Sequence, residues 1–316
     1  MAYATSDEVR IAVVEEAAAG TTPATPVFDI LRLNSESITA NFNTVDSQEL
    51  TTARGQVDAI PAGQSVSGSI EAYACPNDVY QSFLAAILGS STTPFTTGSV
   101  TPGSTLTSYT LEKTIPDSSG SSHYWRVAGL VPNSVTINAS PNEPVTWSFG
   151  FMGGEFSRAT SIVGGATYDP PTPAVNTATP YLADDMAITF GAAALGGPFK
   201  VTAASLTIDS QNREIECVAQ TLGYVALGKL RVSMELTVLF ENLEAYDYLT
   251  NPSTARGTGS FDLNHAGSAG DIEFDFDSIM VENVENQTPG ASQEVVATMS
   301  LVALTKPAGN QVTITV

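Results

Sequence analysis

Basic side chains are scarce in this sequence. Only 12 lysine and arginine residues stand against 33 aspartate and glutamate residues in 316, which gives a formal net charge of −21. Proteins that grip nucleic acid neutralise its phosphates with lysine and arginine, so this charge argues against that class of function. Charged residues of both signs make up only 14% of the chain, so the polar surface must come largely from serine, threonine, asparagine, glutamine and glycine. Such a composition is typical of β-rich proteins.

Cysteines and long apolar runs are also sparse. The two cysteines, Cys75 and Cys217, form neither a disulfide framework nor a metal-binding pair, which fits a reducing compartment. The amino terminus lacks a basic region followed by an apolar core, and no apolar run is long enough to cross a bilayer. We therefore expect a soluble protein that is made in the cytoplasm and has no membrane partner.

Catalytic signatures are missing as well. The sequence has two histidines, His123 and His265, and neither belongs to a nucleophile elbow or stands beside a catalytic cysteine. His123 precedes Tyr124 in a strand pattern, which favours an ordinary hairpin residue over a general base. No dinucleotide-binding, phosphate-loop or zinc-protease motif occurs. The sequence predicts no enzyme, no cofactor and no metal, although a hydrolase that uses two carboxylates stays open.

The most informative segment, residues 63–88, joins a strand to a helix. Small or apolar residues alternate with mostly polar ones from Ser65 to Ala74, which predicts a half-buried strand. Asn77 then stands as an N-cap and Gly89 as a stop. Between them the apolar residues have the spacing of one helix face: Tyr80, Phe83, Leu84, Ile87 and Leu88.

This arrangement occurs a second time. A later strand pattern runs up to Asn242, which would cap a shorter helix over residues 242–249. Gly63 and Gly228 are 165 residues apart, and residues 46–48 and 209–211 share the sequence Asp-Ser-Gln at a distance of 163. We interpret this near-constant displacement as a tandem duplication.

Length and repetition together predict two domains, each with several antiparallel strands and one packed helix. The simplest architecture is a mainly β fold of two tandem sandwiches or partly closed barrels. We divide the chain into an N-terminal arm, a first domain, a linker rich in proline, threonine and glycine, and a second domain, at residues 1–26, 27–157, 158–184 and 185–316. The prolines at the end of the arm favour an extended segment that docks on a neighbour.

A dense ionic pattern lies near the C-terminus. Four carboxylates alternate with three large apolar residues. A calcium loop of the EF-hand type needs glycine at its sixth position, where this sequence has Phe276. The strict period of two instead predicts a strand with a solvated acidic face, made of Asp271, Glu273, Asp275 and Asp277.

Several blocks within residues 10–155 resemble a known family. They are the opening segment IAVVEEAAAGTTPATPVFDILRLNSESI, the strand GQSVSGSIEAY, the helix NDVYQSFLAAILG and the block GLVPNSVTINASPNEPVTWSFGFMGG. In this order they resemble the major tail tube proteins of long, non-contractile-tailed bacteriophages. The order of elements recurs more loosely in residues 185–316.

The resemblance implies a structural virion protein without catalytic residues, which polymerises as stacked rings into a conduit for genome ejection. Members with one domain form six-membered rings, so a tandem member implies homotrimeric rings with pseudo-six-fold symmetry. The resemblance further implies assembly in the host cytoplasm, a place in the virion tail, and tape-measure, tail-terminator and baseplate proteins as partners. The alternative is a carbohydrate-binding or adhesive β-sandwich of a virion or cell surface, which would expose aromatic residues in loops. Both tryptophans, Trp125 and Trp147, instead fall inside strand patterns.

Two surfaces are predicted to serve this function. The polar segment of residues 41–61 is either a flexible loop or a projecting hairpin, and its length favours a functional role. We expect it to contact a neighbouring subunit or ring through Asp46, Gln48, Glu49, Arg54 and Asp58. The second surface is the acidic strand face: DNA must pass without specific binding, so we expect these carboxylates to line the lumen with Ile272, Phe274 and Phe276 in the core behind them. The alternative is that the acidic face lies on the outer wall.

Overall fold

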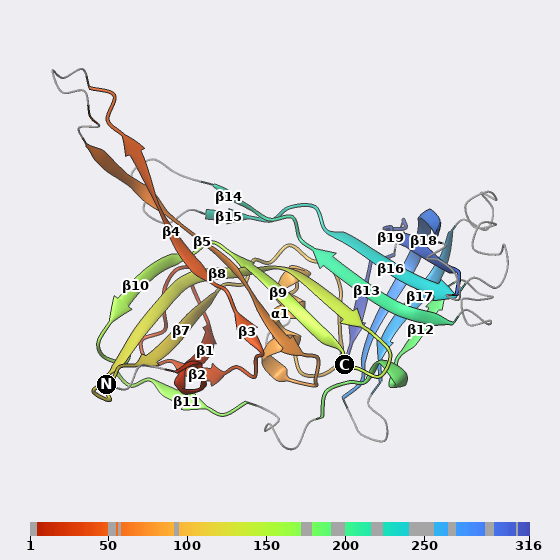
Figure 1. Cartoon of the computed structure of the whole chain (residues 1–316), viewed down its shortest axis with the longest axis horizontal. Coiled ribbons are helices and arrows are strands. Elements are labelled where there is room, and N and C mark those ends of the chain that lie inside the picture. The colour runs from red at the N-terminus through yellow and green to blue at the C-terminus, as the bar shows by residue number, and fades with distance from the viewer. Residues whose placement is uncertain are drawn as a thin grey trace.

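The fold is built mainly from antiparallel strands (Figure 1). The computed structural model describes residues 5–49, 55, 58–91, 95–171, 179–190, 200–215, 224–239, 256–264, 270–287, 294–307 and 309–316. The predicted mainly β class is confirmed within these ranges. Arg54, Cys217, His265 and the second predicted helix, residues 242–249, lie outside them.

The strands of the first half of the chain are β1 (Arg10–Glu15), β2 (Val27–Ile30), β3 (Ser35–Glu36), β4 (Thr39–Asp46), β5 (Ala59–Tyr73), β6 (Ser99–Val100), β7 (Tyr109–Pro116), β8 (Ser122–Ala139), β9 (Thr146–Met152), β10 (Glu155–Ala159) and β11 (Thr167–Asp169). Those of the second half are β12 (Ala187–Phe190), β13 (Val201–Asp209), β14 (Arg213–Ile215), β15 (Tyr224–Ala226), β16 (Arg231–Leu239), β17 (Arg256–Leu263), β18 (Ile272–Gln287), β19 (Val296–Ala303) and β20 (Thr313–Thr315). The helical elements are α1 (Asp78–Ile87) and two short 3₁₀ turns, Ser6–Glu8 and Ala183–Asp185.

Helix α1 begins where the sequence predicts. The side chain of Asn77 accepts hydrogen bonds from the backbone N–H groups of Val79 and Tyr80, at 3.1 and 3.3 Å, which confirms the N-cap. The ring of Tyr80 stacks on Phe149 of β9 with centroids 5.5 Å apart. The apolar face of the helix is therefore packed against the sheet, as its periodicity indicates.

Two layers of strands enclose the core of the first half. The inner layer has the order β4-β5-β9-β8, and the outer layer has the order β2-β1-β7-β8-β10. Strand β8 belongs to both layers, because residues 131–138 pair with β9 whereas residues 122–130 pair with β7. Gly129, with φ +83°, lies next to the point where β8 passes between the layers, in a conformation that glycine adopts readily.

The second half repeats this order, except that no strand among its described residues corresponds to β2. Its inner layer is β13-β16-β19-β18, and its outer layer is β12-β17-β18-β20, which corresponds to β1-β7-β8-β10. We call strands at corresponding positions equivalent: β4 and β13, β5 and β16, β8 and β18, β9 and β19. The match is consistent with the tandem duplication, which stays a prediction together with its domain boundaries.

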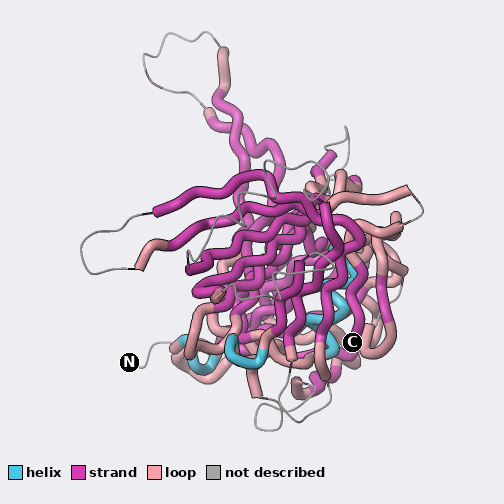
Figure 2. The backbone as a smooth tube through the Cα atoms, turned by 90° about the vertical axis from the view of Figure 1, so that its right-hand side faces the viewer, coloured by secondary structure: helices cyan, strands magenta, loops and turns pink. Residues whose placement is uncertain are grey.

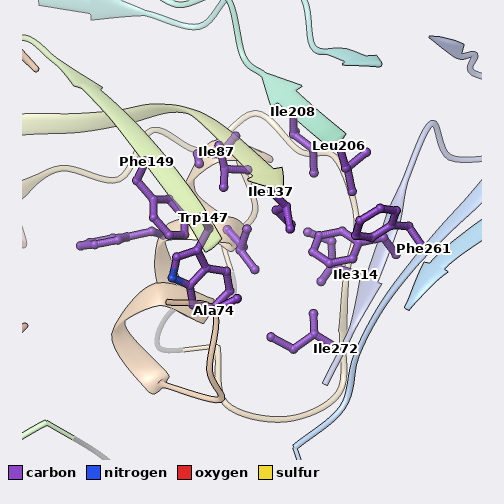
Figure 3. Packing of buried hydrophobic residues seen from close by; sticks show 14 of the residues in the cluster. Ala74, Ile87, Ile137, Trp147, Phe149, Leu206, Ile208, Phe261, Ile272 and Ile314 are labelled. Atoms are coloured by element: carbon purple, nitrogen blue, oxygen red, sulfur yellow. The ribbon is translucent and has the colours of Figure 1, made fainter. Parts of the chain in front are cut away.

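The two inner layers are joined into one sheet. Strand β8 pairs with β13 from Ser134 opposite Asp209 to Ala139 opposite Ala204. The result is an eight-stranded antiparallel sheet of order β4-β5-β9-β8-β13-β16-β19-β18, which we call the joined inner sheet (Figures 1 and 2). The hydrophobic core is continuous across this junction, where Ile87 and Ile137 lie near Ile208 and Leu206 (Figure 3).

Two segments that were expected to lie outside the domains are part of the packed fold. Residues 10–15, expected in an arm that docks on a neighbour, form β1 in the chain's own outer layer, and Ile11 and Val13 are buried there. In the expected linker, β11 pairs with β2, and the fully buried Tyr181 donates a hydrogen bond to the carbonyl of Gly270. The apolar residues of both segments gain more from burial in this core than an extended connection would allow.

Candidate functional surfaces

One face of the joined inner sheet carries mainly short polar side chains. Because opposite residues of an antiparallel pair point to the same side, the pairing fixes the members of this face. At or next to the strand ends, the pairing places Tyr73, Met152, Arg231, Leu239, Val296 and Val302 on this face. Its other members on the six middle strands include Ser67, Ser69, Glu71, Thr146, Ser148, Gly150, Ser134, Thr136, Asn138, Ser205, Thr207, Asp209, Ser233, Glu235, Thr237, Thr298 and Ser300. Their neighbours in each strand, such as Trp147, Phe149 and Leu236, point into the core. We call this surface the hydroxyl face.

The hydroxyl face runs without interruption across the junction of the two halves. Thr136 of β8 lies opposite Thr207 of β13, and their hydroxyl oxygens are 3.3 Å apart in a hydrogen bond. None of the eight strands contains lysine, and on this face Arg231 stands opposite Asp209. The face thus offers hydrogen-bonding groups with few positive charges.

The acidic strand has the predicted alternation but lies in the outer layer. Ile272, Phe274 and Phe276 of β18 are at most 2% exposed, whereas Glu273 is exposed. Phe276 lines a small void together with Leu206 of β13, so the core separates residues 272–277 of β18 from the inner sheet. The carboxylates therefore lie on the opposite side of the core from the hydroxyl face, on the outer surface of the outer layer.

The carboxylates of this outer surface come from two strands. Glu273 lies opposite Asp262 of β17, and Asp275 lies opposite Ser260. Burial raises the pKa of Asp262 to about 6, and the nearby charges of Glu273 and Asp275 act in the same direction, against a hydrogen bond from Ser260. Asp277 differs from these residues, because it accepts a hydrogen bond of 2.6 Å from the backbone N–H of Asn310. Among the described residues, no group of three or more histidine, cysteine or acidic side chains is arranged to hold a metal ion.

The long polar segment forms a projecting hairpin, the second of the two alternatives left open by the sequence. Strands β4 and β5 pair out to Asp46 opposite Ala59 and stand away from the body of the molecule (Figure 1). Gln48, Glu49 and Asp58 lie beyond these pairs, at the far end of the hairpin. The exposed apolar residues Phe42, Val45 and Ile60 lie along it.

Buried charge in the outer layer is paired within the chain. Glu112 of β7 is fully buried and accepts hydrogen bonds from Arg126 Nε, at 2.6 Å, and from the hydroxyl of Tyr168. The guanidinium of Arg10 lies over the ring of Tyr168, 3.5 Å from its centroid. These contacts tie β1, β7, β8 and β11 together and use two of the scarce basic residues for stability.

The hydroxyl face was not identified from the sequence. Its signal is present in the alternation of Thr146, Trp147, Ser148 and Phe149, where hydroxyl residues take every second position. Serine and threonine occur on many surfaces, so their collection on one face becomes visible only through the strand pairing.

A comparison with models of protein families finds a match that covers most of this chain. Residues 6–304 match the family model described as phage tail tube protein. The chain belongs to the phage tail tube protein family. No curated protein sequence matches it. In the described part of this tail tube family member, no helix is long and apolar enough to cross a membrane.

Family membership supports a structural component of the virion tail that assembles with copies of itself into a tube. The family is generally non-enzymatic. Trp147 is fully buried and therefore cannot stack on a sugar, and the exposed Trp125 lies in β8 rather than in a loop, where the alternative of a carbohydrate-binding sandwich would place its aromatic residues.

The raised pKa of Asp262 predicts a pH-dependent stability. In the unfolded chain this carboxyl titrates near 3.8, whereas in the folded chain it titrates near 6. The folded state therefore binds more protons between these values, and the free energy of unfolding falls as pH rises through that window. Asp262→Asn removes the penalty, so we expect it to stabilise the chain at pH 7 by about 1–2 kcal/mol after a discount for partial exposure.

Urea denaturation of both proteins at intervals from pH 4 to pH 7 measures this difference. The gap between Asp262→Asn and the parent chain should be small near pH 4 and largest above pH 6, while the exposed control Asp7→Asn should show no such trend. A gap that is constant with pH would show that the carboxyl titrates normally.

Proposed function

We propose that three copies of this chain form a closed ring in which β18 of one copy pairs with β4 of the next, and that stacked rings form a conduit for genome ejection. The observation that supports this proposal is the β8–β13 junction, where the first half of the chain already pairs with the second half in the required manner. Tape-measure, tail-terminator and baseplate proteins complete the proposed partners, and assembly takes place in the host cytoplasm.

The two ends of the joined inner sheet are free for such a contact. Within the described residues, β4 pairs with β5 alone, and residues 281–287 of β18 pair with β19 alone. Unpaired strand edges recruit other strands. Because the two edges differ, they join copies head to tail. A head-to-tail contact produces a closed ring when the rotation from one copy to the next is an exact fraction of a full turn. Six equivalent halves, the number found in rings of the single-domain proteins that the sequence resembles, require three copies.

The proposed contact has a defined register. The register shift between Pro132 and Ser134 in β8 recurs between Val281 and Asn283 in β18, which makes Ser134 equivalent to Asn283 and hence Thr136 equivalent to Glu285.

Strand β4 is aligned with its equivalent β13 through the strands next to them in the sheet, β5 and β16. Thr39 of β4 pairs with Ser67 and Thr207 of β13 pairs with Ser233, and these two serines lie opposite equivalent ends of β9 and β19. Since Thr207 faces Thr136 within the chain, Thr39 should face Glu285 of the next copy.

The hydroxyl face is the proposed lining of the channel. The outer layers and α1 cover the other face of the joined inner sheet, and they need the larger circumference when the sheet closes on itself. The uncovered hydroxyl face is then inside, where its lack of lysine avoids holding DNA by counterion release. The same geometry favours the outer wall for Asp271, Glu273, Asp275 and Asp277, the alternative to the lumen that the sequence left open.

The projecting hairpin is the proposed contact with a neighbouring subunit or ring, through Asp46, Gln48, Glu49, Arg54 and Asp58. The corresponding connection in the second half contains the hairpin of β14 and β15, which rests on the first half. There the side chain of Val225 in β15 packs against Gly153 of the first half. A Cβ placed on Gly153 would be 2.7 Å from that side chain. The β4–β5 hairpin instead stands away from the body of the molecule (Figure 1), with Phe42 against Phe156, and we infer that its far end reaches another copy.

Cysteine pairs test the register. We expect the double variant Thr39→Cys/Glu285→Cys to form disulfides between copies in oxidised tubes and to yield covalent trimers on a non-reducing gel. The matched control, Thr136→Cys/Thr207→Cys, should form its disulfide within one chain, because these residues face each other in the junction. Each single variant should remain monomeric on the gel. Tubes that form normally but show no cross-link between copies would refute the proposed pairing.

Lysine substitutions distinguish the two candidate linings. Ser148→Lys/Thr298→Lys adds two positive charges to the hydroxyl face, and Glu273→Lys changes the acidic face by the same total charge. We expect the first variant to assemble but to slow genome ejection from virions, most strongly at low salt, because screening is weakest there. Glu273→Lys should eject at the parental rate. The reverse result would place the acidic face in the lumen.

Shortening the hairpin tests its role in assembly. Replacing residues 47–58 with an Asn-Gly turn keeps Asp46 opposite Ala59 and provides a two-residue connection suited to antiparallel strands. We expect a folded protein with an unchanged unfolding temperature that no longer forms tubes in electron micrographs. Normal tubes from this variant would show that the distal hairpin makes no essential contact.

A further inference from the structure

An apolar groove with a volume of about 410 Å³ lies between β4, at one free edge of the joined inner sheet, and the outer layer of the first half. One wall comes from β3, β4 and Ile38 between them, and the other comes from β7, β8 and β10 of the outer layer. Its lining residues are Ile38, Ala40, Phe42, Leu111, Val127 and Phe156, together with Trp125 and a few polar side chains. The ion pair between Lys113 and Glu36, with an N–O distance of 2.6 Å, links the two walls.

Aromatic side chains stand exposed in this groove. Phe42 is 66% exposed and Trp125 is 43% exposed. Phe156 contacts both of them edge to face, with ring centroids 6.1 and 5.5 Å away. A cluster of exposed aromatic residues is costly in water, and such residues often contribute most of the affinity where proteins meet.

The second half shows what covers the equivalent position. Ala40 pairs with Val66 as Ile208 pairs with Val232, which makes Ala40 equivalent to Ile208 and, two residues on, Phe42 equivalent to Ser210. Ser210 is only 4% exposed, and its hydroxyl donates a hydrogen bond to the carbonyl of Ile87 at the end of α1.

The cover thus comes from the preceding half of the chain. Leu206 and Ile208 are fully buried beside Ile87 and Ile137 (Figure 3). In the first half, Phe42 and Trp125 are exposed at this position, and among the described residues no segment takes the place that α1 and β8 take beside Leu206 and Ile208.

We propose that this groove is the socket for the second half of a neighbouring copy, and that Phe42 and Trp125 anchor the closure of the ring. The proposal rests on the ring proposed above and adds its apolar anchor to the strand pairing. Docking buries both aromatic side chains against the core-facing side of the neighbour's inner sheet, at its β18 edge. There Val284 lies near the free edge of β18, and Val295, which is 38% exposed, precedes β19. The neighbour's side of the contact thus offers one partly exposed apolar residue, Val295, beside the core that contains Val284.

Tryptophan fluorescence reports on this socket directly, because the chain has two tryptophans and Trp147 is already fully buried. Acrylamide quenching is measured below and above the concentration at which tubes form. We expect the quenching of Trp125 to fall several-fold on assembly. The variant Trp125→Phe, which retains Trp147 alone, should give the same weak quenching in both states.

A second variant tests the energetic role of the groove. Phe42→Ser copies the residue of the equivalent position, and we expect it to raise the protein concentration needed for tube formation at least tenfold. Its unfolding temperature should stay unchanged, since Phe42 is mostly exposed in the single chain. The matched control Ile162→Ser removes an exposed apolar residue outside the groove and should assemble like the parent.

The outcomes separate the socket from the ring itself. Cross-linking of Thr39→Cys/Glu285→Cys with unchanged Trp125 quenching and normal assembly of Phe42→Ser would overturn the socket while the ring stands. Absence of both the cross-link and the rings would overturn the ring and the socket together. Cross-linking together with protection of Trp125 and impaired assembly of Phe42→Ser supports both.

Discussion

The backbone pairing of β8 with β13 is the contact on which the rest of this structure depends. It joins two similar sets of strands into one sheet, and it places the core of one half against the core of the other. Main-chain hydrogen bonds of this kind depend little on side-chain identity, so they tolerate sequence divergence between the halves. The same pairing leaves one uncovered strand at each end of the sheet. A chain whose halves pair side by side in this way can continue the pattern with further copies.

The charge distribution follows from this arrangement. Acidic residues dominate the sequence, yet the hydroxyl face holds few of them and is formed mainly by serine and threonine. Short hydroxyl side chains keep such a face smooth and hydrated, and they bond to each other across strands, as Thr136 and Thr207 do. Scarce basic residues such as Arg10 and Arg126 are committed to the buried Glu112. A surface that carries DNA past without holding it needs a low density of positive charge more than it needs a high density of negative charge.

Sequence periodicity located the local elements but not the surfaces they create. The cap at Asn77, the helix that follows and the alternation of Ile272, Phe274 and Phe276 with acids were predicted because each depends on neighbouring residues alone. The placement of β1 in the outer layer was missed, since it depends on the pairing of Ile11 and Val13 with β7, more than 90 residues away. The acidic strand drew attention through its density of charge, whereas the hydroxyl face is assembled from strands spread over the whole chain. A face of that kind is defined by register, which periodicity within one strand does not determine.

The most direct test of the account is a reconstruction of assembled tubes by electron cryomicroscopy at a resolution that separates β-strands. The account predicts rings of three chains in which a continuous antiparallel sheet surrounds the channel, with β4 of each chain beside β18 of its neighbour and the hydroxyl face inward. A ring in which the β4 edge is unpaired, or in which the outer layer faces the channel, would contradict it.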